Sequence, residues 1–212
     1  LMDEGAIVRR EEGGWQVVRA VEHIRVPDTL QQIIQSRIDE LDFGSPGARR
    51  ALWMASVIGE EFSEELWLHL FTSTGRDEEE FFRHIRELKR TDMIREVERV
   101  EDGRWRWVYQ FRQGLLQQVA YENMLVERRR EYHREVGRWL EQKHGPHLQA
   151  YYDALAHHYE QGEVWDKAIE YHFKAGQKAQ RDYALQEALE HYQRALALAK
   201  RLWDRGRDGL SL

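Results

Sequence analysis

The chain has 212 residues, of which 42% are hydrophobic and 33% are charged, a balance typical of a globular protein and not of a disordered one. It contains no cysteine, which excludes disulfides, thiolate nucleophiles and cysteine-bound zinc. With 32 basic and 38 acidic residues the net charge is −6, so general attraction to nucleic acid or to anionic lipid is not favoured.

No segment has the length or the composition of a membrane span or a secretion signal. The longest largely apolar stretch, residues 51–58, is far too short to cross a bilayer. The opening residues lack the basic start, apolar middle and small-residue cleavage site of a secretory signal. We therefore expect a cytoplasmic location, no membrane partner, and a chain that forms part of a longer protein.

Two short segments of β type open the chain. Residues 6–10 and 15–18 are rich in Ile, Val and Trp, and they flank Gly13 and Gly14. Glycine supplies the positive φ that tight hairpins need. The pattern predicts a β-hairpin within the first 27 residues.

Two helices are predicted next. The first follows Pro27 and ends near Gly44, with apolar residues at helical intervals. For the second, we expect Ser45 to be the N-cap and Pro46 to occupy the first helical position, where its missing N–H costs nothing. Gly59 ends this second helix.

Two further helices have clear start signals. Ser63 is expected to cap a short helix whose first turn carries glutamates, which the helix dipole favours. After Gly75, the spacing of Asp77 and Glu80 is that of a capping box, and it predicts a helix to about Arg90.

A second β-hairpin is predicted at residues 93–100 and 104–111. In its second strand four aromatic residues alternate with other residues at period two: Trp105, Trp107, Tyr109 and Phe111. Three short helices followed by a β-hairpin is the order of a winged helix. We therefore assign residues 28–126 to a winged-helix domain.

The rest of the chain reads as helices rich in Ala, Tyr, His and Gln. Helical periodicity returns at Leu115 with Leu125 among the expected core residues, and Gly145 and Pro146 break it. The domain boundary is expected between about residues 126 and 147. Three consecutive antiparallel helices are predicted beyond it, at residues 149–161, 165–181 and 184–203.

An internal similarity links two of these helices. Ala168 and Ala175 are echoed by Ala188 and Ala195, at a spacing of 20 residues. Alanine at such positions lets neighbouring helices approach closely. The pattern indicates a helical solenoid in residues 127–212, whose last helix is expected to pack on further repeats.

Several sequence blocks, in the right order, resemble those of large bacterial STAND-type signalling ATPases, which are often fused to nucleotide cyclases, kinases or LuxR-type regulators. The blocks that carry the resemblance are residues 26–30, 37–41, 55–62, 109–112, 118–122, 155–160, 168–169 and 188–189. The resemblance covers nearly the whole chain. It implies tetratricopeptide-like repeats in residues 127–212.

The resemblance also implies a separate role for each segment of the chain. Residues 1–27 would end an ATPase region, residues 28–126 would be a winged helix that restrains an upstream nucleotide-binding domain of the same chain, and the repeats would sense a protein partner. ATP or ADP is implied for the whole protein, with no cofactor in this piece. Relatives often carry a Phe-Arg-His step that senses nucleotide, whereas this chain has Phe111, Arg112 and Gln113. Arg112 and Gln113 are therefore candidate nucleotide-sensing residues, with an uncharged amide replacing the imidazole.

The sequence carries no signature of catalysis or metal binding. It has no G-x-x-x-x-G-K-[ST] loop for phosphates, no H-E-x-x-H metal motif and no G-x-S-x-G nucleophile elbow. We expect no metal site and no enzyme activity in this chain, and we interpret it as a regulatory, protein-interacting piece. The tryptophans expected outside helices, Trp15, Trp105 and Trp107, are the candidate protein-contact residues.

A DNA-binding transcriptional regulator is the alternative, because winged helices often bind duplex DNA. The helix that would enter the major groove begins with four consecutive acidic residues, 77–80. Carboxylates at this position would repel the phosphate backbone. We therefore do not expect DNA to be a partner.

Overall fold

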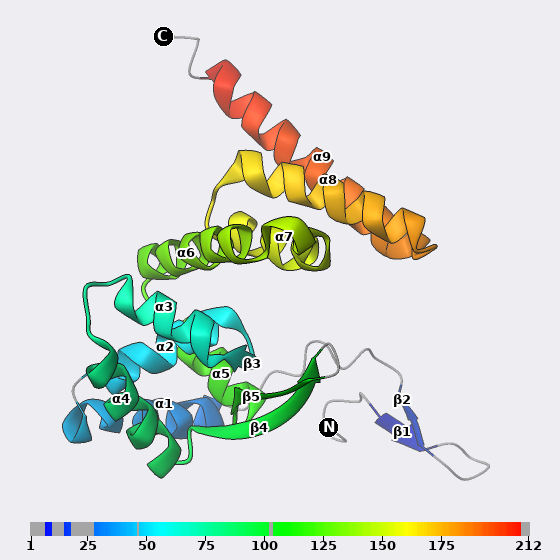
Figure 1. Cartoon of the computed structure of the whole chain (residues 1–212). Helices are drawn as coiled ribbons and strands as arrows, with labels where there is room; N and C mark the ends of the chain where they lie inside the picture. Colours follow the sequence, from blue (N-terminus) through cyan, green and yellow to red (C-terminus); the bar gives the residue numbers. More distant parts are fainter. Residues whose placement is uncertain (1–6, 10–14, 18–27, 46, 102–103, 209–212) are drawn as a thin grey trace.

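The computed structural model describes residues 7–9, 15–17, 28–45, 47–101 and 104–208. These residues form a mainly helical fold with a small three-stranded antiparallel sheet and a separate two-stranded hairpin (Figure 1). No helix among them is long and apolar enough to span a membrane. The elements are β1 (Ile7–Arg9), β2 (Trp15–Val17), α1 (Asp28–Gly44), α2 (Ala48–Ile58), β3 (Glu61–Ser63), α3 (Glu64–Thr72), α4 (Glu78–Arg90), β4 (Ile94–Glu101), β5 (Arg104–Phe111), α5 (Gly114–Glu122), α6 (Val126–His144), the 3₁₀ helix η2 (Gly145–Tyr151), α7 (Tyr152–Gln161), α8 (Trp165–Arg181) and α9 (Leu185–Asp208).

Both predicted hairpins are confirmed. Strands β1 and β2 pair antiparallel with Ile7 opposite Val17, and β4 and β5 pair with Ile94 opposite Phe111. The larger sheet also has a strand that the sequence analysis missed, β3, which pairs with β5 to give the order β3-β5-β4.

The core of the N-terminal part is built around Trp67 of α3. This side chain is fully buried, and its ring meets the edges of Phe62 and Phe81 with centroids 5.0 Å away in both cases. Its indole N–H donates a 2.8 Å hydrogen bond to the Ala51 carbonyl of α2. Trp67 therefore ties α2, α3, α4 and β3 into one core, and its polar atom is satisfied there.

The start signals of three helices can be compared with the structure. Ser63 caps α3 by accepting from Leu66 N–H at 3.3 Å, and Asp77 caps α4 by accepting from Glu80 N–H at 2.7 Å, as predicted. The predicted start of the second helix is wrong, because α2 begins at Ala48 and Ser45 is not its cap; Pro46 lies outside the described residues. The Ser45 hydroxyl instead lies 2.9 Å from His84 Nδ1, and the residue before the helix is Gly47 at φ 100°. Glycine tolerates this left-handed conformation, so the helix begins after it.

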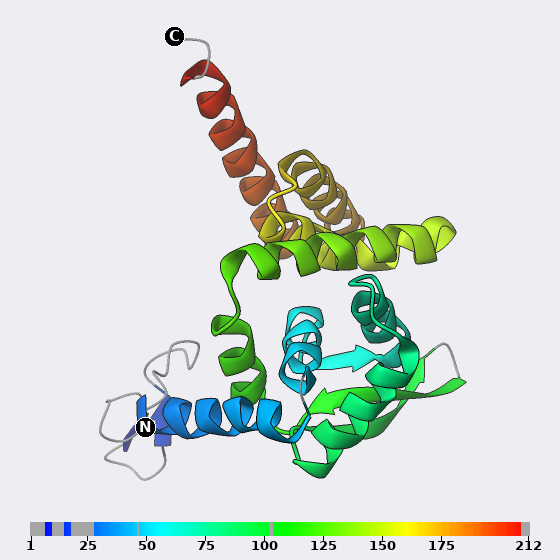
Figure 2. The same ribbon diagram turned by 90° about the vertical axis from the view of Figure 1, so that its left-hand side faces the viewer.

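The C-terminal part is a stack of helices above the first part, with α6 lying between the two (Figures 1 and 2). The helices predicted at residues 149–161, 165–181 and 184–203 are confirmed as α7, α8 and α9, with η2 in place of the first turns of α7. Leu125 was expected in the core, but it is 72% exposed in the link between α5 and α6.

Helix α6 makes contacts on two opposite faces. On one face Glu135 lies 2.9 Å from His69 Nε2, and Lys143 pairs with Glu65, both on α3. On the other face Gly137 approaches α7, and Glu141 accepts a 2.7 Å hydrogen bond from the α8 hydroxyl of Tyr171. Buried side chains from α1 to α9 form one continuous core cluster.

Close packing of α6 on α7 requires the glycine at 137. A Cβ at this position would lie 2.9 Å from the ring of Tyr159, which is itself buried. We expect Gly137→Ala to lower the free energy of unfolding by about 1–3 kcal/mol, because overpacking outweighs the gain in helix propensity. Urea unfolding followed by circular dichroism measures this. Gly145→Ala is the matched control, since a Cβ there meets no atom within 4 Å. Equal stability of the two variants would contradict the prediction.

Candidate functional site

An apolar groove runs between α8 and α9 on the outer side of the helical stack. Its volume is about 650 Å³, and it is open to solvent. The residues that line it are Ile169, Glu170, Phe173, Tyr192, Ala195, Leu196 and Ala199. Phe173 and Leu196 are 51% and 58% exposed, so the groove offers large apolar side chains that the chain itself does not cover.

Helix α9 extends this apolar surface beyond the groove. Ala188, Ala195 and Leu198 are buried against the rest of the stack. Beside these residues a stripe at helical spacing continues the wall of the groove along α9, and it is formed by Leu185, Leu189, Tyr192, Leu196, Ala199 and Trp203. Trp203 is 70% exposed. Tyr192 of this outer stripe packs against Phe173 of α8, whereas Leu189, Leu196 and Trp203 are exposed, so the stripe is a candidate interaction surface.

The β4-β5 hairpin presents two of the three predicted contact tryptophans. Trp105 is 72% exposed and Trp107 is 64% exposed, whereas Tyr109 and Phe111 farther along the same face of β5 are buried. Val100, opposite Trp105 on β4, is also exposed. The hairpin thus carries an apolar face past the edge of the core. Trp15, the third candidate, lies in β2, and its side chain is outside the described residues.

Arg112 and Gln113 follow directly after β5 and are both exposed. The Arg112 guanidinium lies 2.5 Å from the carboxylate of Asp92, in the turn after α4. Gln113 precedes α5 as its N-cap residue but makes no side-chain capping bond. Both side chains are therefore accessible from outside, next to the strand that carries the two exposed tryptophans.

A buried histidine pair joins α6 to α7. Nδ1 of His133 lies 2.9 Å from Nδ1 of His158, and Nε2 of His133 lies 2.9 Å from the hydroxyl of Tyr121. Burial, followed by neighbouring histidines, lowers the pKa of His133 to about 2 and that of His158 to about 3. Both imidazoles are therefore neutral at pH 7, and one ring donates its Nδ1–H to the other across the contact.

A second histidine pair joins α8 to α9. Nδ1 of His172 lies 3.0 Å from Nδ1 of His191, and Nε2 of His172 lies 2.8 Å from Glu160 Oε2 on α7. Burial lowers the pKa of His172. Nε2 of His191 in turn lies 3.0 Å from Asp153 Oδ1, with Glu187 close by. Stacking of the helices thus gathers imidazoles and carboxylates that the sequence analysis did not connect.

The pair of His133 and His158 predicts an acid-sensitive fold. Both pKa values are lower in the folded chain than the ordinary 6.5, so below pH 6.5 the unfolded chain binds more protons. Their contribution to stability is complete above pH 6.5 and is lost as the pH falls. In the wild type the free energy of unfolding should fall as the pH is lowered from 6.5 to 4.5. We expect His133→Asn to make this slope shallower by up to about 1.4 kcal/mol per pH unit. Urea titrations across this range measure it. A slope equal to that of the exposed control His147→Gln would contradict the prediction.

The exposed tryptophans should contribute little to stability. We expect Trp105→Ser and Trp107→Ser each to change the free energy of unfolding by less than about 0.5 kcal/mol. Trp67→Ala, at the buried position, should cost about 3–5 kcal/mol. Thermal and urea unfolding of the three variants test this. A cost for Trp105→Ser or Trp107→Ser similar to that of Trp67→Ala would show that the hairpin is structural.

Comparison of the chain with protein-family models, with curated proteins and with solved structures finds no match.

Proposed function

We propose that this chain is a non-catalytic, cytoplasmic regulatory and protein-interaction part of a multidomain signalling ATPase of the STAND type. In this proposal residues 28–126 are a winged helix that restrains a nucleotide-binding domain, and residues 127–212 are tetratricopeptide-like repeats that bind a protein partner. The observation that carries the proposal is the open groove between α8 and α9 together with the outer stripe of α9, because both leave large apolar side chains uncovered.

The order of elements supports a winged helix. Helices α2, α3 and α4 are followed by the β4-β5 hairpin, and β3 completes the sheet. The hairpin is the wing in this reading, and its exposed Trp105 and Trp107 would contact the nucleotide-binding domain. Arg112 and Gln113 lie at the base of the wing, where they could reach a phosphate of ATP or ADP held by that domain.

Repeated turn geometry supports the repeat assignment. After α7, Val164 N–H donates to the Tyr159 carbonyl at 2.8 Å with Glu163 at φ 55°. After α8, 20 residues later, Ala184 N–H donates to the Ala179 carbonyl at 2.9 Å with Tyr183 at φ 61°. Both are helix ends closed by one left-handed residue. The same closure ends α4, where Met93 N–H donates to the Leu88 carbonyl at 2.9 Å with Asp92 at φ 57°. The 20-residue spacing of the closures after α7 and α8 is therefore what favours a stack of similar helices.

The groove fits an amphipathic helix as its occupant. Its walls are the sides of two antiparallel helices, and helix-in-groove binding uses apolar anchors at helical spacing. Glu170 lines one wall, and the chain has a net charge of −6, so basic residues on the polar face of the partner helix would be favoured.

Duplex DNA is the second candidate ligand, and the charges near α4 disfavour it. Glu78 and Glu79 are exposed at the helix start. Lys89 and Arg90 at the other end are neutralised in part by Glu96 and Glu87, at 2.7 Å in each pair. The first turn of α4, which a DNA-binding winged helix would place against the duplex, is thus acidic, although Arg83 and Arg86 farther along the helix are exposed.

Binding of a labelled amphipathic helical peptide tests the proposal. The peptide has leucines at positions i, i+3, i+4 and i+7 and lysines on the other face, and fluorescence anisotropy follows the titration. We expect saturable binding that Phe173→Asp and Leu196→Asp each weaken at least about tenfold, because they place a charge in the apolar contact. Leu125→Asp is the matched control, since Leu125 is exposed but remote from the groove.

Two outcomes would contradict the proposal. In the first, the peptide binds equally well to the groove variants and to Leu125→Asp. In the second, a labelled random-sequence duplex binds tightly at physiological salt and its affinity falls steeply as salt rises, which would favour the DNA-binding alternative.

A further inference from the structure

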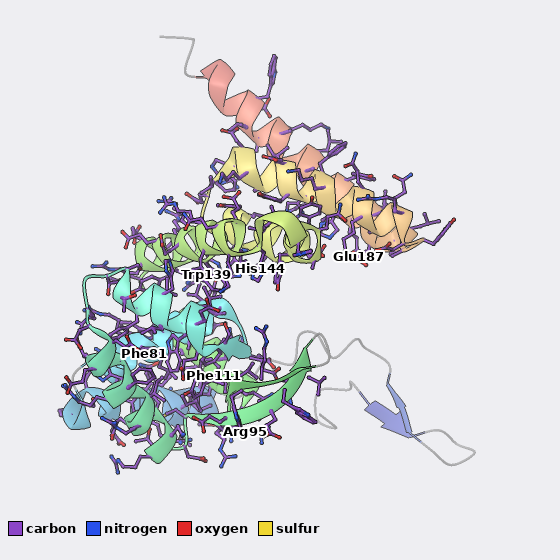
Figure 3. All side chains as sticks on the ribbon, in the orientation of Figure 1. Phe81, Arg95, Phe111, Trp139, His144 and Glu187 are labelled. Carbon is purple, nitrogen blue, oxygen red and sulfur yellow. The ribbon has the colours of Figure 1, made fainter. Side chains whose placement is uncertain are left out.

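Three side chains capable of binding a metal meet where α9 begins. Asp153 comes from α7, and Glu187 and His191 lie one turn apart on α9. One ligand atom from each lies within 4.8 Å of the other two. Figure 3 labels Glu187 at this end of the helical stack. An imidazole nitrogen and two carboxylates are ligand types that Zn²⁺ takes in proteins.

A chain of hydrogen bonds fixes the proton on His191. Glu160 Oε2 can only accept, so His172 donates to it through Nε2, over 2.8 Å. The neutral His172 then has no proton on Nδ1. His191 must therefore donate through its own Nδ1, which lies 3.0 Å away. Nε2 of His191 is then the ring nitrogen that faces Asp153.

This arrangement brings an imidazole nitrogen and a carboxylate oxygen face to face. Nε2 of His191 lies 3.0 Å from Asp153 Oδ1, and that oxygen is buried and makes no hydrogen bond. The other oxygen of Asp153 receives Lys178 Nζ at 3.2 Å. The contact therefore needs a positive charge in it, which either a proton on Nε2 or a bound cation supplies.

We propose that Asp153, Glu187 and His191 form a Zn²⁺ site that joins α7 to α9. The ligand atoms are His191 Nε2, Asp153 Oδ1 and a carboxylate oxygen of Glu187, with water as the fourth ligand. With metal–ligand bonds of about 2.0–2.1 Å, ligand atoms around a tetrahedral ion are about 3.3 Å apart. The 3.0 Å separation of Nε2 and Oδ1 needs to open only slightly, and the Glu187 oxygen, within 4.8 Å of both, would close on the ion by rotation of its exposed side chain.

The residues that contact the three proposed ligands are consistent with a Zn²⁺ site. The sequence of Glu160, His172 and His191 is a carboxylate–histidine chain that orients a metal-binding imidazole. Lys178 donates to Oδ2 of Asp153, which leaves Oδ1 as the oxygen beside His191. Helices α7 and α9 each pack chiefly against α8, so the ion would add a direct link between them. This inference does not depend on the proposed function.

Isothermal titration of the tag-free, metal-free full chain with ZnCl₂ at about pH 7.5 tests the site, since the imidazole must be neutral to bind. We expect one equivalent of Zn²⁺ to bind. Co²⁺ in place of Zn²⁺ should give the visible absorption of a tetrahedral centre. Glu187→Gln and Asp153→Asn should each weaken Zn²⁺ binding at least about tenfold. Glu187 is exposed, so its variant is not expected to unfold.

His172→Gln tests the positioning chain, and His147→Gln is the matched control. His172 contacts the ligand His191, so its loss should weaken Zn²⁺ binding about 10- to 100-fold. His147 is exposed and lies on η2 outside the cluster, so His147→Gln should bind Zn²⁺ as the wild type does. The proposal is overturned if no saturable binding occurs at millimolar ZnCl₂, in which case a proton on His191 fills the gap. Binding that persists unchanged in both Glu187→Gln and Asp153→Asn would also overturn it.

Discussion

The arrangement of this molecule depends on two rows of side chains on opposite faces of α6. Glu135, Trp139 and Lys143 face α3, whereas His133, Gly137 and Glu141 face α7 and α8. Each row repeats every four residues, and the rows are offset by two residues, which is about 200° around a helix. Helix α6 is therefore shared by both parts of the chain, and any change in its position is felt on both sides. Figure 2 shows this helix lying across the molecule between the two parts.

A shared helix gives the proposed regulation a physical route. The outer stripe of α9 lies in the upper helical stack, and the β4-β5 hairpin lies in the lower part of the molecule (Figure 1). A partner that shifts α8 and α9 would act on α6 through Glu141 and Gly137, and α6 would act on α3 through Glu135. His133 and His158 form a buried, neutral pair between α6 and α7, so a charge introduced at this interface would be destabilising. Packed interfaces of this kind have few alternative arrangements, so a shift of one element displaces its neighbours.

Local sequence signals predicted most of the helices and strands, because their causes are local. Ser63 and Asp77 cap helices through atoms three residues away, and the alternation of aromatics in β5 identifies a strand without knowledge of its partner. Ser45 failed as a cap because His84, 39 residues later, engages its hydroxyl. Strand β3 has three residues, too few for a pattern, and it exists because β5 pairs with it. The cluster of Asp153, Glu187 and His191 could not be predicted from the sequence, because only the stacking of α7, α8 and α9 brings these residues together.

Hydrogen exchange on Val136→Ala tests the central role of α6 most directly. Val136 is fully buried on α6, and its truncation should lower the free energy of opening in the most protected amides. If α6 joins both parts into one cooperative unit, amides of α3 and of α8 lose protection by the same amount. Loss of protection in α2, α3 and α4 with unchanged protection in α7, α8 and α9 would contradict this account.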